Sequence, residues 1–474
     1  MKPTQKPCFL GTMVKNKAED TGLSDSIRIG SWYALPDLLL RDYHISVPLD
    51  YNSSDSIHIA LFVREVIATG KKEQRLPYLL FLQGGPGFQS PRPHEAGGWL
   101  KRACKEYRVI LLDQRGTGLS TPLTTSSLGQ FSSTQEQANY LQHFRADSIV
   151  KDAEYVRSCL DQDKEPWTVL GQSYGGFCAV TYLSFASEGL RQVLLTGGLP
   201  PVKSGCTAEL VYRSCFKQVT QQNKKFYKQF PEAVKVVQEI VLFLHNTEDG
   251  GVDLPSGGKL SPRGLQLLGL SGLGSSGGFE RLHYLLERAW DPVLVQGTPK
   301  RLSSTFLRMF ENWFSFDTNP LYALMHESIY CQGAASNWAA HRIRDEFRDQ
   351  FDAVKAAKNG EPVFFTGEMV FPWMFDELTA LRPLKELANL LAAKEDWPPL
   401  YDETALKANE VPVAAAAYYE DMYVSFPLSE ETANRITGIR LWVTNEYMHS
   451  GLRDDGARIL DYLFDMLGGK KLLE

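Results

Sequence analysis

Short apolar runs alternate with helix-like segments through the first 200 residues of the chain. The runs, rich in leucine and β-branched residues, lie at residues 78–82, 107–112, 167–170 and 192–196. The segments with a helical pattern lie at residues 98–105, 147–160 and 174–187. Continuous apolar strands that alternate with helices are typical of a mostly parallel sheet with helices on both faces. The pattern therefore predicts an α/β fold.

Two further patterns bound this region. Residues 43–49 and 56–67 alternate loosely between apolar and polar side chains around a polar turn, which predicts an antiparallel hairpin. Residues 1–40 show little periodicity, and we expect an extended lead-in there. The alternation of strands and helices stops at residues 197–201, which read Gly-Gly-Leu-Pro-Pro.

The rest of the chain begins with a long helix-like part. A stretch rich in glycine and serine interrupts it at residues 249–278. Strand patterns return at residues 411–418 and 438–443, with helical patterns near residues 429–436 and 454–467. The alternation of the first part thus resumes at the C-terminal end.

These patterns divide the chain into two structural units. We expect an α/β core formed by residues 1–199 and 401–474, with a large, mainly helical cap of residues 200–400 inserted before its seventh strand. Ligands of open α/β sheets bind outside the carboxyl ends of the strands, and an insertion at this place normally covers that edge. The sequence therefore predicts a site between the core and the cap.

Composition narrows the class of protein. Of 474 residues, 43% are hydrophobic and 22% charged, and the formal net charge of −6 provides no basic patch for nucleic acid. No apolar stretch approaches the roughly 20 residues of a membrane-spanning helix. Lysines interrupt the first 20 residues, where a secretory signal would be apolar. We expect a soluble, cytoplasmic protein that binds neither nucleic acid nor membranes.

The cysteines and histidines form no metal-binding pattern. The seven cysteines are scattered and include no Cys-x-x-Cys pair. Neither His94-Glu95 nor His326-Glu327 is completed as His-Glu-x-x-His. We therefore expect no metal, no cofactor and no disulfide framework.

A glycine-rich turn follows the apolar run at residues 167–170. Residues 171–175 read Gly-Gln-Ser-Tyr-Gly, which fits the Gly-x-Ser-x-Gly turn between a strand and a helix. Such a turn holds its serine in strained backbone angles, so only small residues fit two positions before and after it. A serine presented in this way becomes a nucleophile when a neighbouring base takes its proton. The motif predicts a serine hydrolase with Ser173 as the nucleophile.

A second glycine-rich turn follows the run at residues 78–82. Gly84 and Gly85 in this turn allow the backbone to approach a ligand closely. The N–H of Tyr174, directly after the serine and at the start of a helix, is expected to be a further donor. Together these groups predict an oxyanion hole for the tetrahedral intermediate of acyl transfer.

The acid and the base are expected after the cap, because the chain order in this type of hydrolase is serine, acid, histidine. Of nine histidines, only His449 follows the last expected strand. The acid should follow the strand at residues 411–418, where Glu420 and Asp421 are both available. Either carboxylate could orient the imidazole so that its free nitrogen accepts the serine proton.

Three short motifs occur together in this chain. They are Gly-Gly-Pro-Gly at residues 84–87, Asp-Gln-Arg-Gly-x-Gly-x-Ser at residues 113–120 and Gly-x-Ser-x-Gly-Gly at residues 171–176. In combination they resemble the proline iminopeptidase family of α/β-hydrolases. The resemblance implies the α/β-hydrolase fold and favours Asp421 as the acid, since it lies 28 residues before His449. One departure is Gln83, where many members of the family have histidine.

The resemblance also implies a substrate. Members of the family release an N-terminal residue, typically proline, so small peptides with a free N-terminus are the expected partners. A protonated amine needs counter-charges, and the match to the family's amine-binding glutamates suggests Glu327 and Glu368, with Glu420 as a further candidate. The pyrrolidine ring needs an apolar slot, for which residues 313–316 and 371–375 are the richest aromatic segments.

Other functions are compatible with the same residues. The chain could be an esterase or amidase without amine selection, or an aminopeptidase for another small residue. It could also be a non-catalytic binding protein with a hydrolase fold, but candidates for serine, acid and histidine all occur in the expected order. The sequence is compatible with an oligomer and does not define one.

Overall fold

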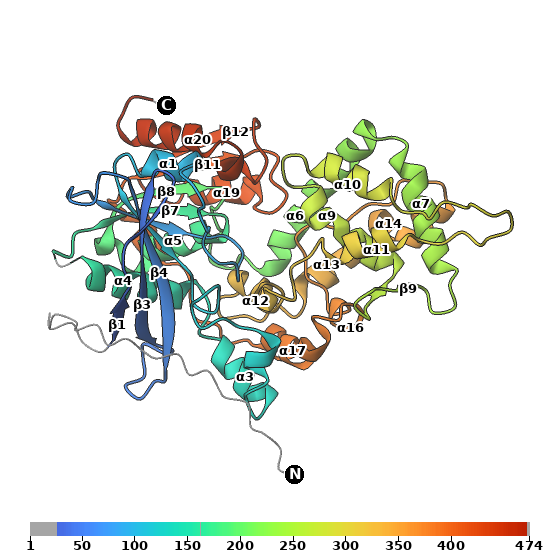
Figure 1. The fold of residues 1–474 in the computed structure, drawn as a ribbon, viewed down its shortest axis with the longest axis horizontal. Coiled ribbons are helices and arrows are strands. Elements are labelled where there is room, and N and C mark those ends of the chain that lie inside the picture. The colour runs from blue at the N-terminus through green and yellow to red at the C-terminus, as the bar shows by residue number, and fades with distance from the viewer. Residues whose placement is uncertain (1–25, 162, 472–474) are drawn as a thin grey trace, which may run out of the picture.

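The computed structural model describes residues 26–161 and 163–471, which form a core around one large sheet and a mainly helical lobe beside it (Figure 1). The strands of the large sheet are β1 (Ile27–Ile29), β2 (Tyr33–Leu35), β3 (Leu38–Pro48), β4 (His58–Ala68), β5 (Tyr78–Leu82), β6 (Arg108–Leu112), β7 (Trp167–Gln172), β8 (Leu190–Thr196), β11 (Val413–Tyr418) and β12 (Ile439–Thr444). Their order is β1-β3-β4-β6-β5-β7-β8-β11-β12, and β2 pairs with β3.

Hydrogen bonding divides this sheet into an antiparallel edge and a parallel remainder. β3 and β4 form a long antiparallel hairpin, and β4 is antiparallel to β6. β6, β5, β7, β8, β11 and β12 all run parallel. The predicted hairpin is therefore present, and the predicted α/β-hydrolase fold with a mostly parallel central sheet is confirmed.

Helices cover both faces of the sheet. The helices of the core are α1 (Gly98–Ala103), α2 (Thr125–Leu128), α3 (Thr134–Leu141), α4 (Ala146–Leu160), α5 (Tyr174–Phe185), α19 (Phe426–Ala433) and α20 (Gly451–Leu467). In β5, Leu79 and Phe81 lie in one buried cluster with side chains of α1 and α20. Leu80 and Leu82 point to the opposite face and lie in a second cluster, with side chains of α4 and α5. Burial on both faces explains why β5 is apolar throughout.

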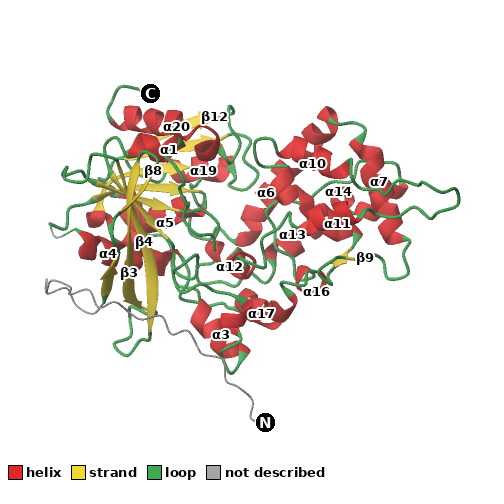
Figure 2. Ribbon diagram, viewed as in Figure 1, coloured by secondary structure: helices red, strands yellow, loops and turns green. Residues whose placement is uncertain are grey.

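Most of the chain between β8 and β11 is helical, as Figure 2 shows. Its helices are α6 (Ala208–Gln229), α7 (Ala233–His245), α8 (Pro262–Leu265), α9 (Gly269–Gly272), α10 (Gly278–Leu286), α11 (Ser304–Glu311), α12 (Pro320–Met325), α13 (Ala339–Glu346), α14 (Arg348–Phe351), α15 (Ala353–Lys358), α16 (Met374–Glu377), α17 (Lys385–Ala393) and α18 (Glu403–Lys407). We call the part from α6 to α17 the cap. It contacts the core, for example through α17 against α3, whereas α18 packs on α5 of the core.

Two segments whose sequence shows no clear period contain short regular elements. Within the expected lead-in, β1 and β2 pair with β3, and residues 1–25 lie outside the described residues. The Gly/Ser-rich stretch at residues 249–278 contains α8, α9 and a small hairpin of β9 (Val252–Asp253) and β10 (Lys259–Leu260). These elements are two to four residues long and are therefore too short to produce a detectable period.

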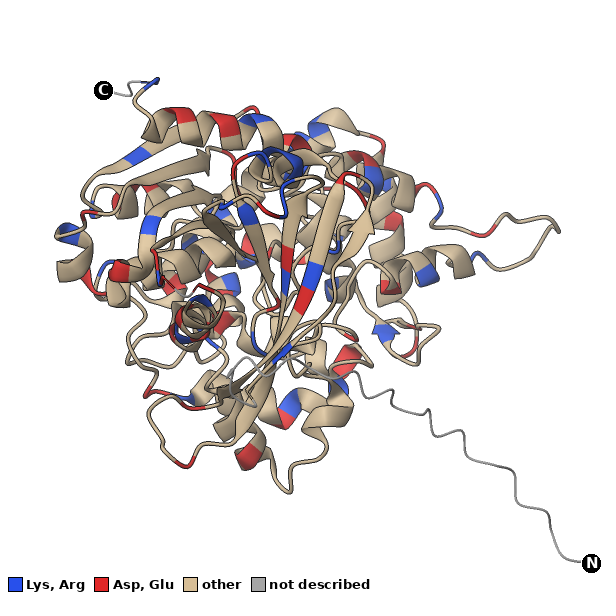
Figure 3. Cartoon of the chain, turned by 60° about the vertical axis from the view of Figure 1, so that its left-hand side comes forward, with Lys and Arg blue, Asp and Glu red and all other residues tan. Residues whose placement is uncertain are grey.

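The distribution of charge shows no segregation by sign. Basic and acidic positions are interspersed along the helices and strands in the view of Figure 3. Within the ranges that the structure describes, no helix is both long and apolar enough to cross a bilayer. The same residues contain no group of three or more His, Cys, Asp or Glu arranged to hold a metal ion.

Candidate active site

Ser173 lies at a sharp turn between β7 and α5. Its φ of 56° and ψ of −125° lie in a region that residues other than glycine rarely adopt. Neighbouring glycines permit the turn, because a Cβ at Gly175 would lie 1.9 Å from the carbonyl oxygen of Leu82. A Cβ at Gly171 would lie 2.5 Å from the carbonyl oxygen of Gly175. The strained turn expected from Gly-x-Ser-x-Gly is thus present.

The loops after β11 and β12 bring an acid and a histidine to this serine. His449 Nε2 lies 2.8 Å from Ser173 Oγ, and His449 Nδ1 lies 2.6 Å from Asp421 Oδ2. Asp421 is 3% exposed, and its Oδ1 accepts hydrogen bonds from the N–H groups of Tyr423 at 2.8 Å and Val424 at 3.0 Å. The carboxylate is therefore fixed against the imidazole. The structure brings together the three residues that the sequence assigned as nucleophile, acid and base.

Opposing effects act on the pKa of His449. Burial lowers it, but the negative charge of Asp421 and its hydrogen bond to the ring act in the other direction. Glu368 adds a smaller upward contribution and Arg453 a downward one. The net result is a pKa raised above the ordinary value of about 6.5.

The residues predicted to bind an oxyanion lie beside Ser173. Tyr174 is the first residue of α5, so its N–H has no acceptor within the helix. Gly84 approaches the serine so closely that a Cβ there would lie 2.9 Å from Ser173 Cβ. Gln114 Nε2 donates to the carbonyl oxygen of Gln83 at 3.0 Å and thereby holds the loop that carries Gly84. The motif at residues 113–120, which contains Gln114, thus helps to hold the Gly-Gly-Pro-Gly loop at residues 84–87 in place.

A cavity of about 290 Å³ lies in front of the serine, between the core and the cap. Its core side includes Gly84, Gly85, Ser173 and His449. Aromatic residues form much of the remaining wall: Phe88, Trp313, Phe314, Phe316, Tyr322 and Tyr423. Among the described residues that line it, Glu368 is the one carboxylate. The cavity therefore combines apolar surface with one carboxylate and two arginines, Arg281 and Arg453, beside the Ser-His-Asp arrangement.

Comparisons with known proteins agree with this geometry. A family model described as alpha/beta hydrolase fold matches residues 77–243. The chain is 47% identical to a proline iminopeptidase from Aeromonas sobria over 432 residues, which are 91% of this chain and 97% of that protein. The chain belongs to the proline iminopeptidase family. Proline iminopeptidase aneH from Aspergillus aculeatus is 35% identical, over 89% of this chain and 92% of its own.

Membership of the proline iminopeptidase family confirms the prediction made from the three motifs, and with it the prediction of a serine exopeptidase. Family membership does not by itself place the residues that hold the substrate amine. Of the three carboxylates predicted for that role, the structure brings only Glu368 to the cavity. Its side chain is half-buried, and its Oε1 accepts a hydrogen bond from the Tyr322 hydroxyl at 2.7 Å.

The other two carboxylates lie elsewhere in this member of the proline iminopeptidase family. Glu327 is buried, and its oxygens accept hydrogen bonds from the N–H groups of Ala339 at 3.1 Å and Ala340 at 2.9 Å. It therefore caps the N-terminus of α13 and does not line the cavity. Glu420 forms an ion pair with Lys225 of α6, also outside the cavity lining. In this structure, therefore, neither of these two carboxylates lies on the cavity wall, and each already has another partner.

The predicted aromatic segments divide in the same way. Residues 313–316 line the cavity, whereas residues 371–375 do not and contribute buried side chains to the cap. The sequence analysis did not predict that Phe88, Tyr322 and Tyr423 line the cavity. Phe88 directly follows the Gly-Gly-Pro-Gly motif and Tyr423 lies two residues after Asp421, so their positions next to motifs could have indicated them. Tyr322 lies in the cap, far in sequence from any motif.

Proposed function

We propose that this chain is a serine aminopeptidase that releases an N-terminal proline from small peptides. The observation that carries the proposal is the hydrogen-bonded series Ser173–His449–Asp421, which faces a cavity containing one carboxylate. The names of the two relatives, at 47% and 35% identity over most of the chain, support proline as the preferred residue.

The proposed mechanism follows from the positions of these atoms. His449 Nε2 accepts the proton of Ser173 while Oγ attacks the carbonyl carbon of the N-terminal residue, and Asp421 stabilises the imidazolium. The N–H of Tyr174 and those of the loop at residues 84–85 stabilise the oxyanion. Protonated His449 then donates to the leaving amine, and water hydrolyses the acyl-enzyme by the same route.

Glu368 supplies the counter-charge for the substrate amine. Its carboxylate is held by Tyr322, so it is oriented before the substrate arrives. When the ammonium group of the substrate loses its bound water in the cavity, a charge-assisted hydrogen bond to the Glu368 carboxylate stabilises it. The neighbouring rings of Trp313 and Phe314 provide apolar surface for a pyrrolidine ring.

Replacing this carboxylate is expected to change substrate selection rather than general reactivity. Glu368→Gln should lower kcat/KM for proline β-naphthylamide by about 10- to 100-fold, the usual worth of a hydrogen bond to a charged group. Hydrolysis of p-nitrophenyl acetate, which has no amine, should change far less. Glu420→Gln is the matched control, because that carboxylate lies outside the cavity lining. Equal losses of Glu368→Gln on both substrates would show that Glu368 supports packing and not amine binding.

The pH dependence provides a second test of the same arrangement. Only the neutral imidazole accepts the serine proton, so kcat/KM should fall as the pH drops through the raised pKa of His449. Because Glu368 contributes to raising that pKa, Glu368→Gln should shift the acid limb of the pH–rate profile to lower pH. The exposed substitution Glu386→Gln on α17 should leave the limb in place. If the acid limb of Glu368→Gln lies at the same pH as that of the wild type, or at a higher pH, this account is contradicted.

A panel of aminoacyl β-naphthylamides tests the proposed specificity. The purified protein should cleave the prolyl compound fastest and should lose activity when the amine is acetylated. Equal cleavage of the acetylated compound would indicate an amidase or esterase without amine selection. Faster cleavage of the alanyl compound would indicate an aminopeptidase for another small residue.

A further inference from the structure

Two arginines on the wall of the active-site cavity have no carboxylate partner. Arg281 lies on α10 of the cap and Arg453 on α20 of the core, and both line the cavity that contains Ser173. Both side chains are exposed, and in the part of the chain that the structure describes neither forms an ion pair. Ser173 is buried and Glu368 half-buried, so the arginines lie where the cavity meets solvent.

The positive charges of these arginines converge on one part of the cavity. Burial and nearby carboxylates raise the pKa of Tyr423, and Arg453 and Arg281 both act against that increase. The Tyr423 ring lies 4.8 Å from that of His449, and Arg453 also acts to lower the pKa of His449 itself. Arg281 Nη2 donates to the Ser275 hydroxyl at 2.7 Å, which restricts its side chain.

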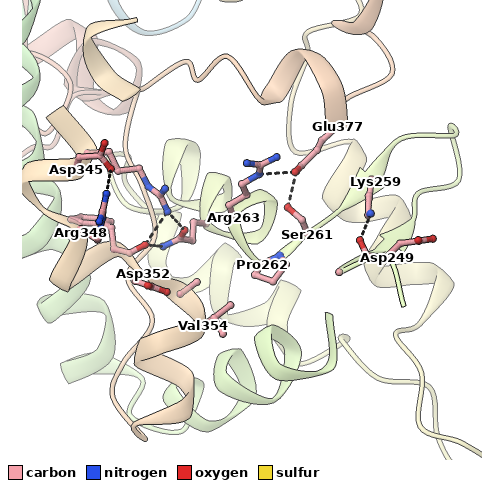
Figure 4. Close-up of a pocket in the computed structure, with 15 residues that line it drawn as sticks. Asp249, Lys259, Ser261, Pro262, Arg263, Asp345, Arg348, Asp352, Val354 and Glu377 are labelled. Atoms are coloured by element: carbon pink, nitrogen blue, oxygen red, sulfur yellow. Dashed lines mark hydrogen bonds and ion pairs between the residues drawn. The ribbon is translucent and has the colours of Figure 1, made fainter. Parts of the chain in front are cut away.

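Two arginines in another cavity of the cap differ in this respect. That cavity, of about 480 Å³, is shown in Figure 4. There Arg263 lies 2.7 Å from Glu377, and Arg348 lies 3.2 Å from Asp345. Two of its three arginines are thus paired with carboxylates, whereas Arg344 donates to Gln266 Oε1 and to the carbonyl oxygen of Phe351 and forms no ion pair among the described residues. The arginines of the active-site cavity have no paired carboxylate within residues 26–161 and 163–471, which leaves them available to an anionic group of a ligand.

We propose that Arg281 and Arg453 bind the C-terminal carboxylate of a di- or tripeptide whose N-terminal residue occupies the catalytic site. The inference rests on the proposed function and specifies its substrate class. A guanidinium group matches a carboxylate with two parallel N–H···O bonds, and Arg is the side chain best suited to this geometry. Glu368 would hold one end of the peptide and the arginines the other, within a cavity at the small end of the usual range for ligands.

The nearest carboxylate in the sequence does not compete for this role. Asp454 follows Arg453 directly, but its Oδ2 accepts hydrogen bonds from the hydroxyls of Ser276 and Ser450, each at 2.6 Å. The bond from Ser276 joins the cap to the core close to His449 in the chain. The carboxylate of Asp454 therefore has partners of its own, and both arginines keep their charge free for the substrate.

The test compares peptides that differ only in the terminal charge. Wild-type kcat/KM should be about tenfold higher for Pro-Ala than for Pro-Ala-amide, the usual worth of one charge-assisted hydrogen bond. In Arg281→Gln, Arg453→Gln and the double variant, this acid-to-amide ratio should fall toward one. The matched control Arg288→Gln replaces an exposed arginine just beyond α10, outside the cavity lining, and should keep the wild-type ratio.

Three results would overturn the proposal. The first is a wild-type acid-to-amide ratio of kcat/KM near one, and the second is a high acid-to-amide ratio in the variants. The third is a preference for Pro-Asp-amide over Pro-Ala, which would indicate recognition of a side-chain carboxylate. Failure of the proposed function is a separate outcome, because then no N-terminal prolyl compound, acid or amide, would be cleaved. Since the readout is a ratio within each variant, a partial loss of folded protein does not alter it.

Discussion

Ser173→Ala is expected to lower kcat for proline β-naphthylamide by about 10⁶-fold, the size of effect seen when a catalytic serine is removed from a serine protease. The substitution removes the only atom that can form the acyl-enzyme, and it leaves His449 without the hydroxyl that lies 2.8 Å from its Nε2. Residual hydrolysis would come from substrate binding and the oxyanion donors alone. Initial rates at saturating substrate measure this directly.

A matched serine on α5, the helix that follows Ser173, provides the control. Ser184 is 8% exposed, as Ser173 is, and its Oγ donates back to the carbonyl of Val180 at 3.0 Å. Ser184→Ala should therefore retain activity, and both variants should unfold at temperatures close to that of the wild type. Activity of Ser173→Ala within tenfold of the wild type would contradict the assignment of the nucleophile.

Asp421→Asn is expected to lower kcat by about 10⁴-fold without unfolding the protein. The asparagine oxygen can keep the two bonds that Oδ1 accepts from the N–H groups of Tyr423 and Val424. Its NH₂ group then faces His449 Nδ1 in place of Oδ2 and donates to it. This selects the tautomer with a proton on Nε2, which can no longer accept the proton of Ser173.

The same substitution should also lower the pKa of His449, because it removes the main upward contribution of Asp421. Stopped or steady-state assays of proline β-naphthylamide hydrolysis measure the loss of rate, and thermal unfolding checks the fold. A loss smaller than about tenfold, well short of the effect expected for a wrong tautomer, would show that another group orients the imidazole.

The core could be predicted from the sequence because its signals are local. Most strands of the parallel sheet contain a continuous apolar run, and the strained turn at Ser173 requires glycines at fixed positions. The histidine followed from chain order, which also limited the acid to Glu420 or Asp421, and the resemblance to the family favoured Asp421. β1 and β2 gave no such signal, because strands of three residues contain no recognisable period.

The substrate-binding side of the cavity could not be predicted in the same way. Whether a glutamate binds a ligand depends on which groups already satisfy its carboxylate, and this is decided by tertiary packing. Glu327 is occupied by the first N–H groups of α13, and Glu420 by Lys225, contacts that span parts of the cap or join it to the core. Of the three predicted glutamates, only Glu368 lies on the cavity wall.

The most direct test of the central claim is the identity of the products released from a peptide. Pro-Ala-Ala and its N-acetyl derivative are incubated with the wild type and with Ser173→Ala, and the products are identified by mass spectrometry. We predict free proline and Ala-Ala in equal amounts from Pro-Ala-Ala with the wild type only, and no cleavage of the acetylated peptide. Cleavage by Ser173→Ala at the wild-type rate, or equal cleavage of the acetylated peptide, would contradict the account.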